Sequence, residues 1–268
     1  MSWTEGDVRL DGATIHYHRR GSGPPVVLAH GVLDDGRCWT RIAEALEPDY
    51  DLVAYDARFH GQSDAPEDGQ WRGVADFIGV VDALGLDRPS AIGHSLGAAT
   101  IAGALAGRPD LLGAAVLADP PWREPLLQPG ELGGVVGLFR EMIGGKSVDE
   151  VAALGREMNP TWQASELEPW AESKVRFRGF DAMASVAGNL ADDWKVTVAA
   201  FRVPVLLVTG GDESKGRIVT PEVAARARAL SPSLEVVCFE GAGHNVQRDA
   251  YDDFVVAVRY FLARTRSG

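Results

Sequence analysis

The sequence predicts an α/β fold with a mainly parallel sheet, helices on both of its faces and an inserted helical cap. Short apolar runs typical of buried strands alternate with helical patterns along most of the 268 residues, which indicates a parallel sheet covered by helices. Strand patterns disappear from Pro121 to Phe201, and no linker rich in Ser, Pro or Gly separates the parts. We therefore expect one core made of residues 1–120 and 203–268, with residues 121–202 forming the cap.

Composition and charge restrict the possible functions. A net charge of −12 argues against a nucleic-acid partner, because phosphate binding requires a basic surface. The first residues have neither a basic region nor an apolar core, and no uncharged apolar run reaches the length of a membrane span. We expect a cytoplasmic protein with no membrane partner. Cys38 and Cys238 have no partner motif and are expected to be ordinary buried thiols.

The chain opens with two alternating segments, Val8–Leu10 and Thr14–His18, on either side of an Asp-Gly turn. This pattern predicts a β-hairpin. His16 and His18 point to the same face of the second strand, and a His-x-His pair is able to bind a metal ion. No third ligand lies nearby in the sequence, so we interpret the pair as ordinary strand residues and expect no metal site.

The first buried strand, Val26–Ala29, ends at His30-Gly31-Val32. A continuous apolar run of this kind is typical of a parallel strand that is covered on both faces. The loop after the His-Gly pair is free to direct a backbone N–H inward. The next elements expected along the chain are a helix over Arg37–Glu47, a strand over Tyr50–Asp56 and a helix over Trp71–Leu86.

A Gly-x-Ser-x-Gly pentapeptide centred on Ser95 follows the apolar strand Ser90–Ile92 and precedes a helical pattern of small residues, Ala98–Gly107. A turn that sharp forces its central residue into a strained conformation, so residues without bulk are needed on both sides, as Gly93 and Gly97 supply. The Ser95 hydroxyl is then left standing above the carboxyl end of the sheet.

Two strand ends offer a carboxylate that could accompany this serine. The strand Leu112–Ala118 ends at Asp119, which two prolines follow, and the strand Val205–Thr209 is followed by Gly-Gly-Asp212. Between them, two Ser-x-x-Glu spacings, starting at Ser147 and Ser165, predict capping boxes at helix starts in the cap.

The last part of the chain completes the core. A helix over Thr220–Leu230 and a strand over Leu234–Phe239 lead to a glycine-rich loop that holds His244, and a helix over Ala250–Ala263 follows. A serine hydroxyl is a poor nucleophile at neutral pH, so it needs a neutral imidazole to take its proton and a carboxylate to orient that imidazole. His244 is the histidine placed to be this base.

The order of His-Gly loop, serine turn, strand-end acid and late histidine resembles the α/β-hydrolase fold superfamily, in its serine esterase and lactonase-like branch. The segment from Asp56 to Ser63 is also similar to a family motif, although Phe59 replaces the usual glycine. The resemblance implies an oxyanion hole formed by the backbone N–H groups of Val32 and Leu96. It implies no cofactor.

The triad acid has two candidates in this sequence. The family commonly places it after the strand that follows the cap, which points to Asp212, but some relatives place it about two dozen residues after the nucleophile, where Asp119 lies. The segment around Asp212 departs from the common Gly-x-x-Asp form, since Glu213 stands at the expected position. We favour Asp119 and keep Asp212 as the alternative.

The predicted activity is hydrolysis of a carboxylic ester or lactone through an acyl-enzyme. Alternatives on the same triad are a carbon–carbon bond hydrolase, a thioesterase or a perhydrolase, and a non-enzymatic small-lactone receptor is a further alternative. The cap is rich in apolar and aromatic residues, which favours a small hydrophobic substrate, and a homodimer is possible. The expected pocket residues are His30, Gly31, Trp122, Phe139, Trp162 and Met183.

Overall fold

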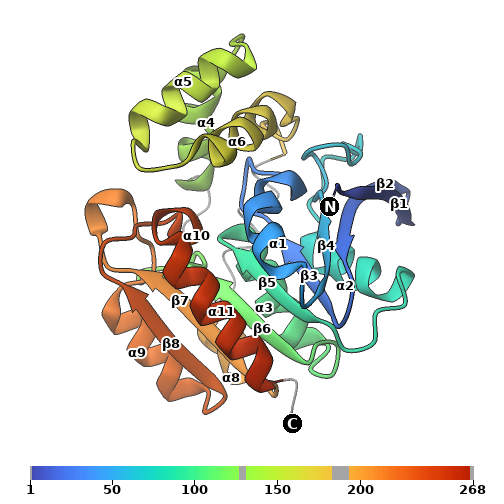
Figure 1. Ribbon diagram of the computed structural model, residues 1–268, viewed down its shortest axis with the longest axis vertical. Helices are drawn as coiled ribbons and strands as arrows, with labels where there is room; N and C mark the ends of the chain where they lie inside the picture. Colours follow the sequence, from blue (N-terminus) through green and yellow to red (C-terminus); the bar gives the residue numbers. More distant parts are fainter. Residues whose placement is uncertain (1, 127–130, 183–192, 266–268) are drawn as a thin grey trace.

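The computed structural model describes residues 2–126, 131–182 and 193–265. Its centre is one eight-stranded sheet with the order β1-β2-β4-β3-β5-β6-β7-β8 (Figure 1). The hairpin β1–β2 and the pair β2–β4 are antiparallel, and all the other pairs are parallel. The strands are β1 (Thr4–Leu10), β2 (Ala13–Gly21), β3 (Pro25–Ala29), β4 (Asp51–Tyr55), β5 (Ser90–His94), β6 (Ala114–Ala118), β7 (Val205–Gly210) and β8 (Leu234–Phe239).

Helices cover both faces of the sheet (Figure 1). One apolar cluster joins α2, α3, α8 and α9 to the sheet, and a second cluster joins α1 and α11 to its other face. The parallel strands β3, β4 and β6 are therefore buried along almost their whole length, as their continuous apolar sequences predict. The bounds are α1 (Thr40–Leu46), α2 (Gly73–Ala83), α3 (Leu96–Gly107), α8 (Trp194–Ala199), α9 (Pro221–Leu230), α10 (Val246–Asp249) and α11 (Tyr251–Thr265), with short 3-10 turns at Gly36–Trp39 and Glu213–Lys215.

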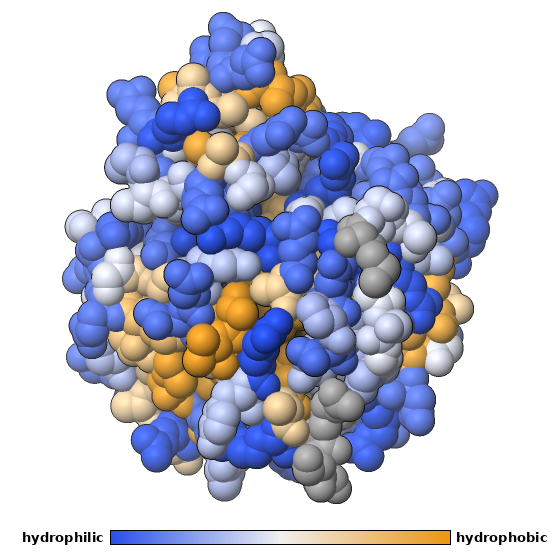
Figure 2. Space-filling view, in the orientation of Figure 1, coloured by the Kyte–Doolittle hydropathy of each residue, from blue (hydrophilic) through white to orange (hydrophobic). Residues whose placement is uncertain are grey.

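Three further helices lie together at one end of the sheet, as Figure 1 shows. They are α4 (Glu131–Ile143), α5 (Val148–Met158) and α6 (Ala164–Arg176), and they share a small apolar cluster around Val151, Leu167 and Trp170 that is separate from the two core clusters. The fold is thus the expected α/β arrangement with a helical insertion. The surface in this view is mostly hydrophilic, with apolar residues gathered over β8 and α11 (Figure 2).

The limits of the cap stay a prediction, and one helix inside them packs with the core. In α8, Trp194 and Val198 belong to the large core cluster, and Trp194 stacks on Trp122 with ring centroids 5.7 Å apart. The return from the cap to the core therefore begins before residue 203.

Two local expectations are wrong. Ser147 caps α5 in a capping box with Glu150, as expected, but α6 begins at Ala164 after Gln163 and has no side-chain cap. Ser165 lies within the first turn, where its hydroxyl is past the capping position. Cys238 is exposed instead of buried, because β8 is an edge strand in which only Leu234 is buried. No helix of the described residues has both the length and the apolarity needed to cross a membrane.

Candidate active site

Ser95 occupies the turn between β5 and α3. Its backbone angles are φ 51° and ψ −113°, a conformation that residues with side chains rarely adopt. The Ser95 N–H donates to the Ala118 carbonyl at 2.9 Å, which ties the turn to the end of β6. The strained conformation is therefore held by the neighbouring strand.

Glycines allow this turn to form. A Cβ atom at Gly93 would lie 2.7 Å from the Ala98 nitrogen, and one at Gly97 would collide with the Ala29 carbonyl. A Cβ atom at Gly31 would lie 2.8 Å from Nδ1 of His94 and 3.5 Å from Cβ of Ser95. The loop after β3 thus comes close to the serine because Gly31 has no side chain.

His244 lies in the loop after β8, and its Nδ1 is 2.7 Å from Oδ2 of Asp119. Asp119 is fully buried and stands just beyond β6 with a positive φ of 40°. Its two carboxylate oxygens also accept hydrogen bonds at 3.0 Å from the backbone N–H groups of Ile218 and Val219. These donors fix the carboxylate, and the carboxylate in turn fixes the Nδ1 edge of the imidazole.

The other candidate acid is turned away from this pair. Asp212 accepts hydrogen bonds from the backbone N–H of Ser214 at 2.9 Å and from its hydroxyl at 2.6 Å. These contacts make Asp212 the N-cap of the short 3-10 turn that follows β7. The structure therefore brings Asp119 to His244 and leaves Asp212 in a local capping position.

A cavity of about 440 Å³ lies between the cap and the carboxyl ends of the strands, and Ser95 and His244 both line it. This volume is within the range of small-molecule sites. Of the expected pocket residues, Phe139 and Trp162 line the cavity. The other lining residues are Val32, Leu33, Asp34, His94, Met158, Asn159, Pro160, Thr161, Trp170, Lys174, Ser214, Lys215, Asn245 and Asp249.

Three expected pocket residues do not line this cavity. His30 is buried below it, where Nδ1 contacts the Gly31 carbonyl at 2.8 Å and Nε2 accepts from the Ala57 N–H at 2.9 Å. Gly31 packs closely against His94 and Ser95, and Trp122 is buried in the core against Trp194. Their proximity in sequence to site residues was misleading, because each packs inward. Met183 lies outside the described residues.

Backbone N–H groups are available near Ser95. Leu96 is the first residue of α3, so its N–H is one of those that a helix leaves without an intrahelical acceptor. Val32 lines the cavity beside Ser95. The next residue, Leu33, has a positive φ of 66° and donates its N–H to Nε2 of His60 at 3.3 Å, which fixes the loop. The oxyanion hole formed by Val32 and Leu96 stays a prediction.

Comparison with known proteins places the chain in a family. Residues 26–258 match the model of the alpha/beta hydrolase family. N-formylmaleamate deformylase from Pseudomonas putida is 31% identical over 96% of each chain. The chain belongs to the alpha/beta hydrolase family. Hydrolase chemistry is therefore supported, while the bond that this hydrolase cleaves is a separate question.

Two further relatives cover nearly the whole chain. The 2-(acetamidomethylene)succinate hydrolase from Mesorhizobium japonicum is 26% identical over 93% of this chain and 91% of its own. A crystal structure of E-2-(acetamidomethylene)succinate hydrolase has a TM-score of 0.82 and 25% identity, and covers 97% of this hydrolase and 99% of that chain. The similarity therefore includes the cap as well as the core.

A buried cluster of charges at the junction of cap and core was missed by sequence reasoning. Asp34 pairs through one oxygen with Lys174 of α6 and through the other with Arg248 of α10 at 2.9 Å. Burial opposes ionisation of Asp34, but Arg248 and Lys174 outweigh it and hold the pKa of Asp34 below its usual range. No motif marks these residues, because they are brought together only by the fold.

Three buried histidines lie near the site of this hydrolase, and of these His94 alone lines the cavity. Burial lowers the pKa of His30, and burial together with His30 lowers the pKa of His60 to about 3. Burial and the nearby His244 hold the pKa of His94 well below its ordinary value. Nε2 of His94 is 2.9 Å from the His244 carbonyl, so a neutral His94 supports the loop of His244.

Proposed function

We propose that this chain is a serine hydrolase that cleaves a carboxylic ester or lactone through an acyl-enzyme on Ser95. The observation that carries the proposal is the 2.7 Å contact between His244 and the buried Asp119, beside a strained serine that opens into the same cavity. A backbone-fixed carboxylate selects the tautomer with a proton on Nδ1, which leaves Nε2 of His244 free to accept the serine proton.

In the first half of the reaction, His244 takes the Ser95 proton as the hydroxyl oxygen attacks the substrate carbonyl. The negative charge that develops on the carbonyl oxygen is stabilised by the N–H groups of Val32 and Leu96. Each donor lowers the barrier by about 3 kcal/mol. The imidazolium, stabilised by Asp119, then protonates the leaving alkoxide. The product is an ester of Ser95 and a released alcohol; in a lactone the alcohol stays attached to the acyl group.

In the second half, His244 takes a proton from a water molecule that attacks the acyl-enzyme. The tetrahedral intermediate collapses, the imidazolium returns the proton to the Ser95 oxygen, and the carboxylic acid is released. A carboxylate nucleophile is needed for the alkyl-enzyme esters of epoxide opening and halide displacement, so a serine at this turn disfavours both reactions.

A second candidate substrate class is an N-acyl compound that carries a carboxylate. Two relatives are named for hydrolysis of N-formylmaleamate and 2-(acetamidomethylene)succinate, and both match over more than nine tenths of this chain. Lys215 lines the cavity, and its positive charge favours an anionic substrate over a neutral ester. Lys174 also lines the cavity, but its charge is paired with Asp34. The same serine mechanism cleaves either bond, with an amine in place of the alcohol.

The aromatic lining supports the first class. Phe139, Trp162 and Trp170 face the cavity, and large aromatic side chains favour apolar acyl or ring groups. We keep a small hydrophobic ester or lactone as the proposed substrate. A panel of neutral esters, lactones and carboxylate-bearing N-acyl compounds decides between the classes by their kcat/KM values.

The decisive experiment compares two serines of the same cavity. We expect steady hydrolysis of p-nitrophenyl acetate, a loss of about 10⁵-fold or more in kcat in Ser95→Ala, and little change in Ser214→Ala. Steady turnover by Ser95→Ala equal to that of the wild type would refute the proposal. Lactone binding without turnover by the wild type would support the receptor alternative. Preferential cleavage of thioesters would support the thioesterase alternative, and preferential cleavage of diketones would support the carbon–carbon bond hydrolase. Peroxide-dependent formation of a peracid would identify a perhydrolase.

The cytoplasmic location and the possible homodimer are also proposals. The acidic composition of the sequence supports the first. The apolar surface over β8 and α11 (Figure 2) supports the second, and Val256 and Tyr260 of α11 are exposed. Light scattering after gel filtration tests the dimer directly.

A further inference from the structure

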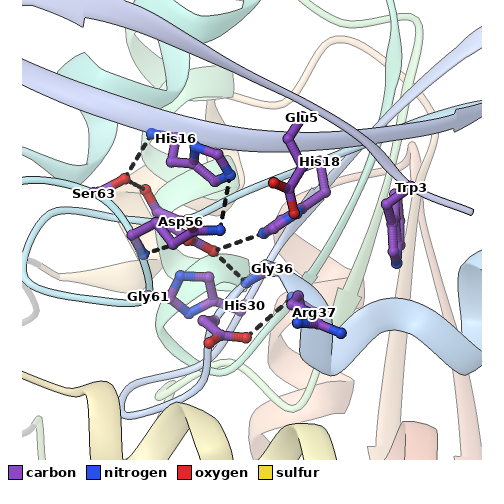
Figure 3. Close-up of polar contacts among 12 residues, drawn as sticks. Trp3, Glu5, His16, His18, His30, Gly36, Arg37, Asp56, Gly61 and Ser63 are labelled. Carbon is purple, nitrogen blue, oxygen red and sulfur yellow. Dashed lines mark hydrogen bonds and ion pairs between the residues drawn. The ribbon is translucent and has the colours of Figure 1, made fainter.

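Away from the candidate active site, the hairpin of β1 and β2 brings two histidines and two carboxylates to one face. The strand register pairs Glu5 with His18 and Asp7 with His16, and residues two apart on a strand point the same way. Figure 3 shows the Glu5 carboxylate beside the His16 and His18 side chains. The missing third ligand of the His-x-His pair is therefore supplied by the partner strand, where no sequence spacing would reveal it.

The distances suit a metal ion. One donor atom from each of Glu5, His16 and His18 lies within 4.8 Å of the others, and the two imidazole rings are 4.9 Å apart. Donors that share a tetrahedral zinc ion with bonds of about 2.0–2.2 Å lie roughly 3.3 Å apart. Glu5 is exposed, so its side chain can make the small movement that closes the site.

The second nitrogen of each imidazole already has a carboxylate beside it. Nδ1 of His16 is 2.8 Å from Oδ1 of Asp7, and Nε2 of His18 is 3.7 Å from Oδ1 of the buried Asp56 (Figure 3). A carboxylate at one ring nitrogen is the usual outer partner of a metal-bound histidine, because it fixes the tautomer and directs the other nitrogen to the metal.

The remaining nitrogens are the ones a metal would use. His18 is 1% exposed, and its Nδ1 has no hydrogen-bond partner although Oε1 of Glu5 lies 3.3 Å away. A buried polar atom without a partner is costly. Nε2 of His16 faces the side-chain nitrogen of Gln62 at 3.1 Å, and this exposed side chain would turn aside when a metal binds.

We propose that Glu5, His16 and His18 form a binding site for a transition-metal ion such as Zn²⁺, with water completing the coordination. Two imidazoles and one carboxylate without thiolate suit Zn²⁺, Co²⁺, Ni²⁺ and Cu²⁺ better than the hard ions Ca²⁺ and Mg²⁺. In the sheet order, β4 and β3 lie between β2 and β5, so the ion takes no part in the reaction at Ser95. It holds the edge strand β1 to β2.

The test uses the full chain, with any purification tag removed and metal stripped by a chelator. Calorimetric titration with Zn²⁺ is expected to give one site per chain, and Zn²⁺ is expected to raise Tm because it binds only the folded hairpin. Co²⁺ is expected to give the visible absorption of a bound ion. Wild-type protein that shows neither a Zn²⁺ isotherm nor a Tm shift overturns the proposal.

Variants locate the site. His18→Ala is expected to abolish Zn²⁺ binding and Glu5→Gln to weaken it, while Asp7→Asn raises Kd about 10- to 100-fold by removing the outer partner of His16. Glu5 and Asp7 are exposed, so these two variants decide the matter if His18→Ala fails to fold. Cys238→Ser, which removes the exposed thiol, is the control and is expected to bind Zn²⁺ normally. Normal binding in Glu5→Gln and Asp7→Asn together, or loss only in Cys238→Ser, overturns the proposal.

Discussion

The turns that present Ser95 and Asp119 and the junction between cap and core are stabilised in different ways. At the turns, both residues have positive φ angles, and backbone hydrogen bonds to neighbouring strands hold them. At the junction, Asp34 is paired with Lys174 and Arg248 in a buried cluster of charges. One region depends on backbone geometry and the other on side-chain pairs between distant segments.

This difference explains why the two regions are not equally visible in the sequence. A backbone that must bend sharply restricts residue types at fixed spacing, so the Gly-x-Ser-x-Gly pentapeptide can be recognised. A buried ion pair requires only that opposite charges meet in the folded protein. Its members can come from any two segments, so no fixed spacing marks them in the sequence. The predictions that follow test the contrast between the two regions.

The largest effect is expected at the turns. Asp119→Asn removes the charge that orients His244, and kcat is expected to fall about ten-thousand-fold. Asp212→Asn is the matched variant, and it is expected to leave kcat nearly unchanged because Asp212 caps a local turn. Steady-state kinetics measures both, and thermal unfolding checks that Asp119→Asn still folds. The opposite ranking would assign the acid to Asp212.

At the junction we expect a loss of stability. Asp34→Asn leaves the buried Lys174 without its counter-charge and leaves Arg248 with only Glu166, 3.6 Å away, which costs about 3–5 kcal/mol. Urea unfolding gives the change in the free energy of unfolding. The matched variant is Asp181→Asn, since Asp181 pairs with Arg140 on the exposed surface of the cap at 3.0 Å and exposed pairs contribute little. Equal effects of the two variants would show that burial does not decide the contribution.

Acid is expected to destabilise the fold in two separate pH windows, one set by the buried His60 and one by Asp34 at the junction. Because the folded pKa of His60 is about 3 and its unfolded pKa is about 6.5, the folded state favours the neutral ring. Its contribution is complete above pH 6.5 and declines as the pH falls, by about 2 kcal/mol at pH 5. Asp34 has a lowered pKa, so its contribution is lost only below about pH 4, the unfolded value.

Urea unfolding at a series of pH values separates the windows. His60→Gln is expected to flatten the slope between pH 6.5 and 5 and leave the fall below pH 4, whereas Asp34→Asn is expected to remove part of the fall below pH 4 alone. The pKa values of His30 and His94 are also lowered. These two residues account for the pH dependence of the free energy of unfolding that remains in His60→Gln. A slope between pH 6.5 and 5 that is unchanged in His60→Gln contradicts the first window.

The sequence predicted those features that local chemistry determines. The order of strands and helices, the turn at Ser95 and the strand-end position of Asp119 follow from apolar patterns, glycines and prolines. Residues that meet only through the fold were not predictable: Glu5 reaches His18 across a strand register, and Lys174 reaches Asp34 from another helix. Trp122 was misplaced because an apolar residue that follows a strand end near the candidate site packs equally well in a core.

The smallest effect is expected within the cap itself, where two similar sequence patterns have different structures. Ser147 accepts the Glu150 N–H at 3.3 Å, and the Glu150 carboxylate accepts the Ser147 N–H at 2.8 Å, whereas Ser165 lies inside α6 and caps nothing. Ser147→Ala is therefore expected to destabilise α5 by about 1 kcal/mol. Hydrogen exchange of the α5 amides measures this change, because the loss of stability is local to α5. We expect kcat to stay unchanged. Ser165→Ala is the control, and a cost equal to that of Ser147→Ala would show that the spacing alone forms the cap.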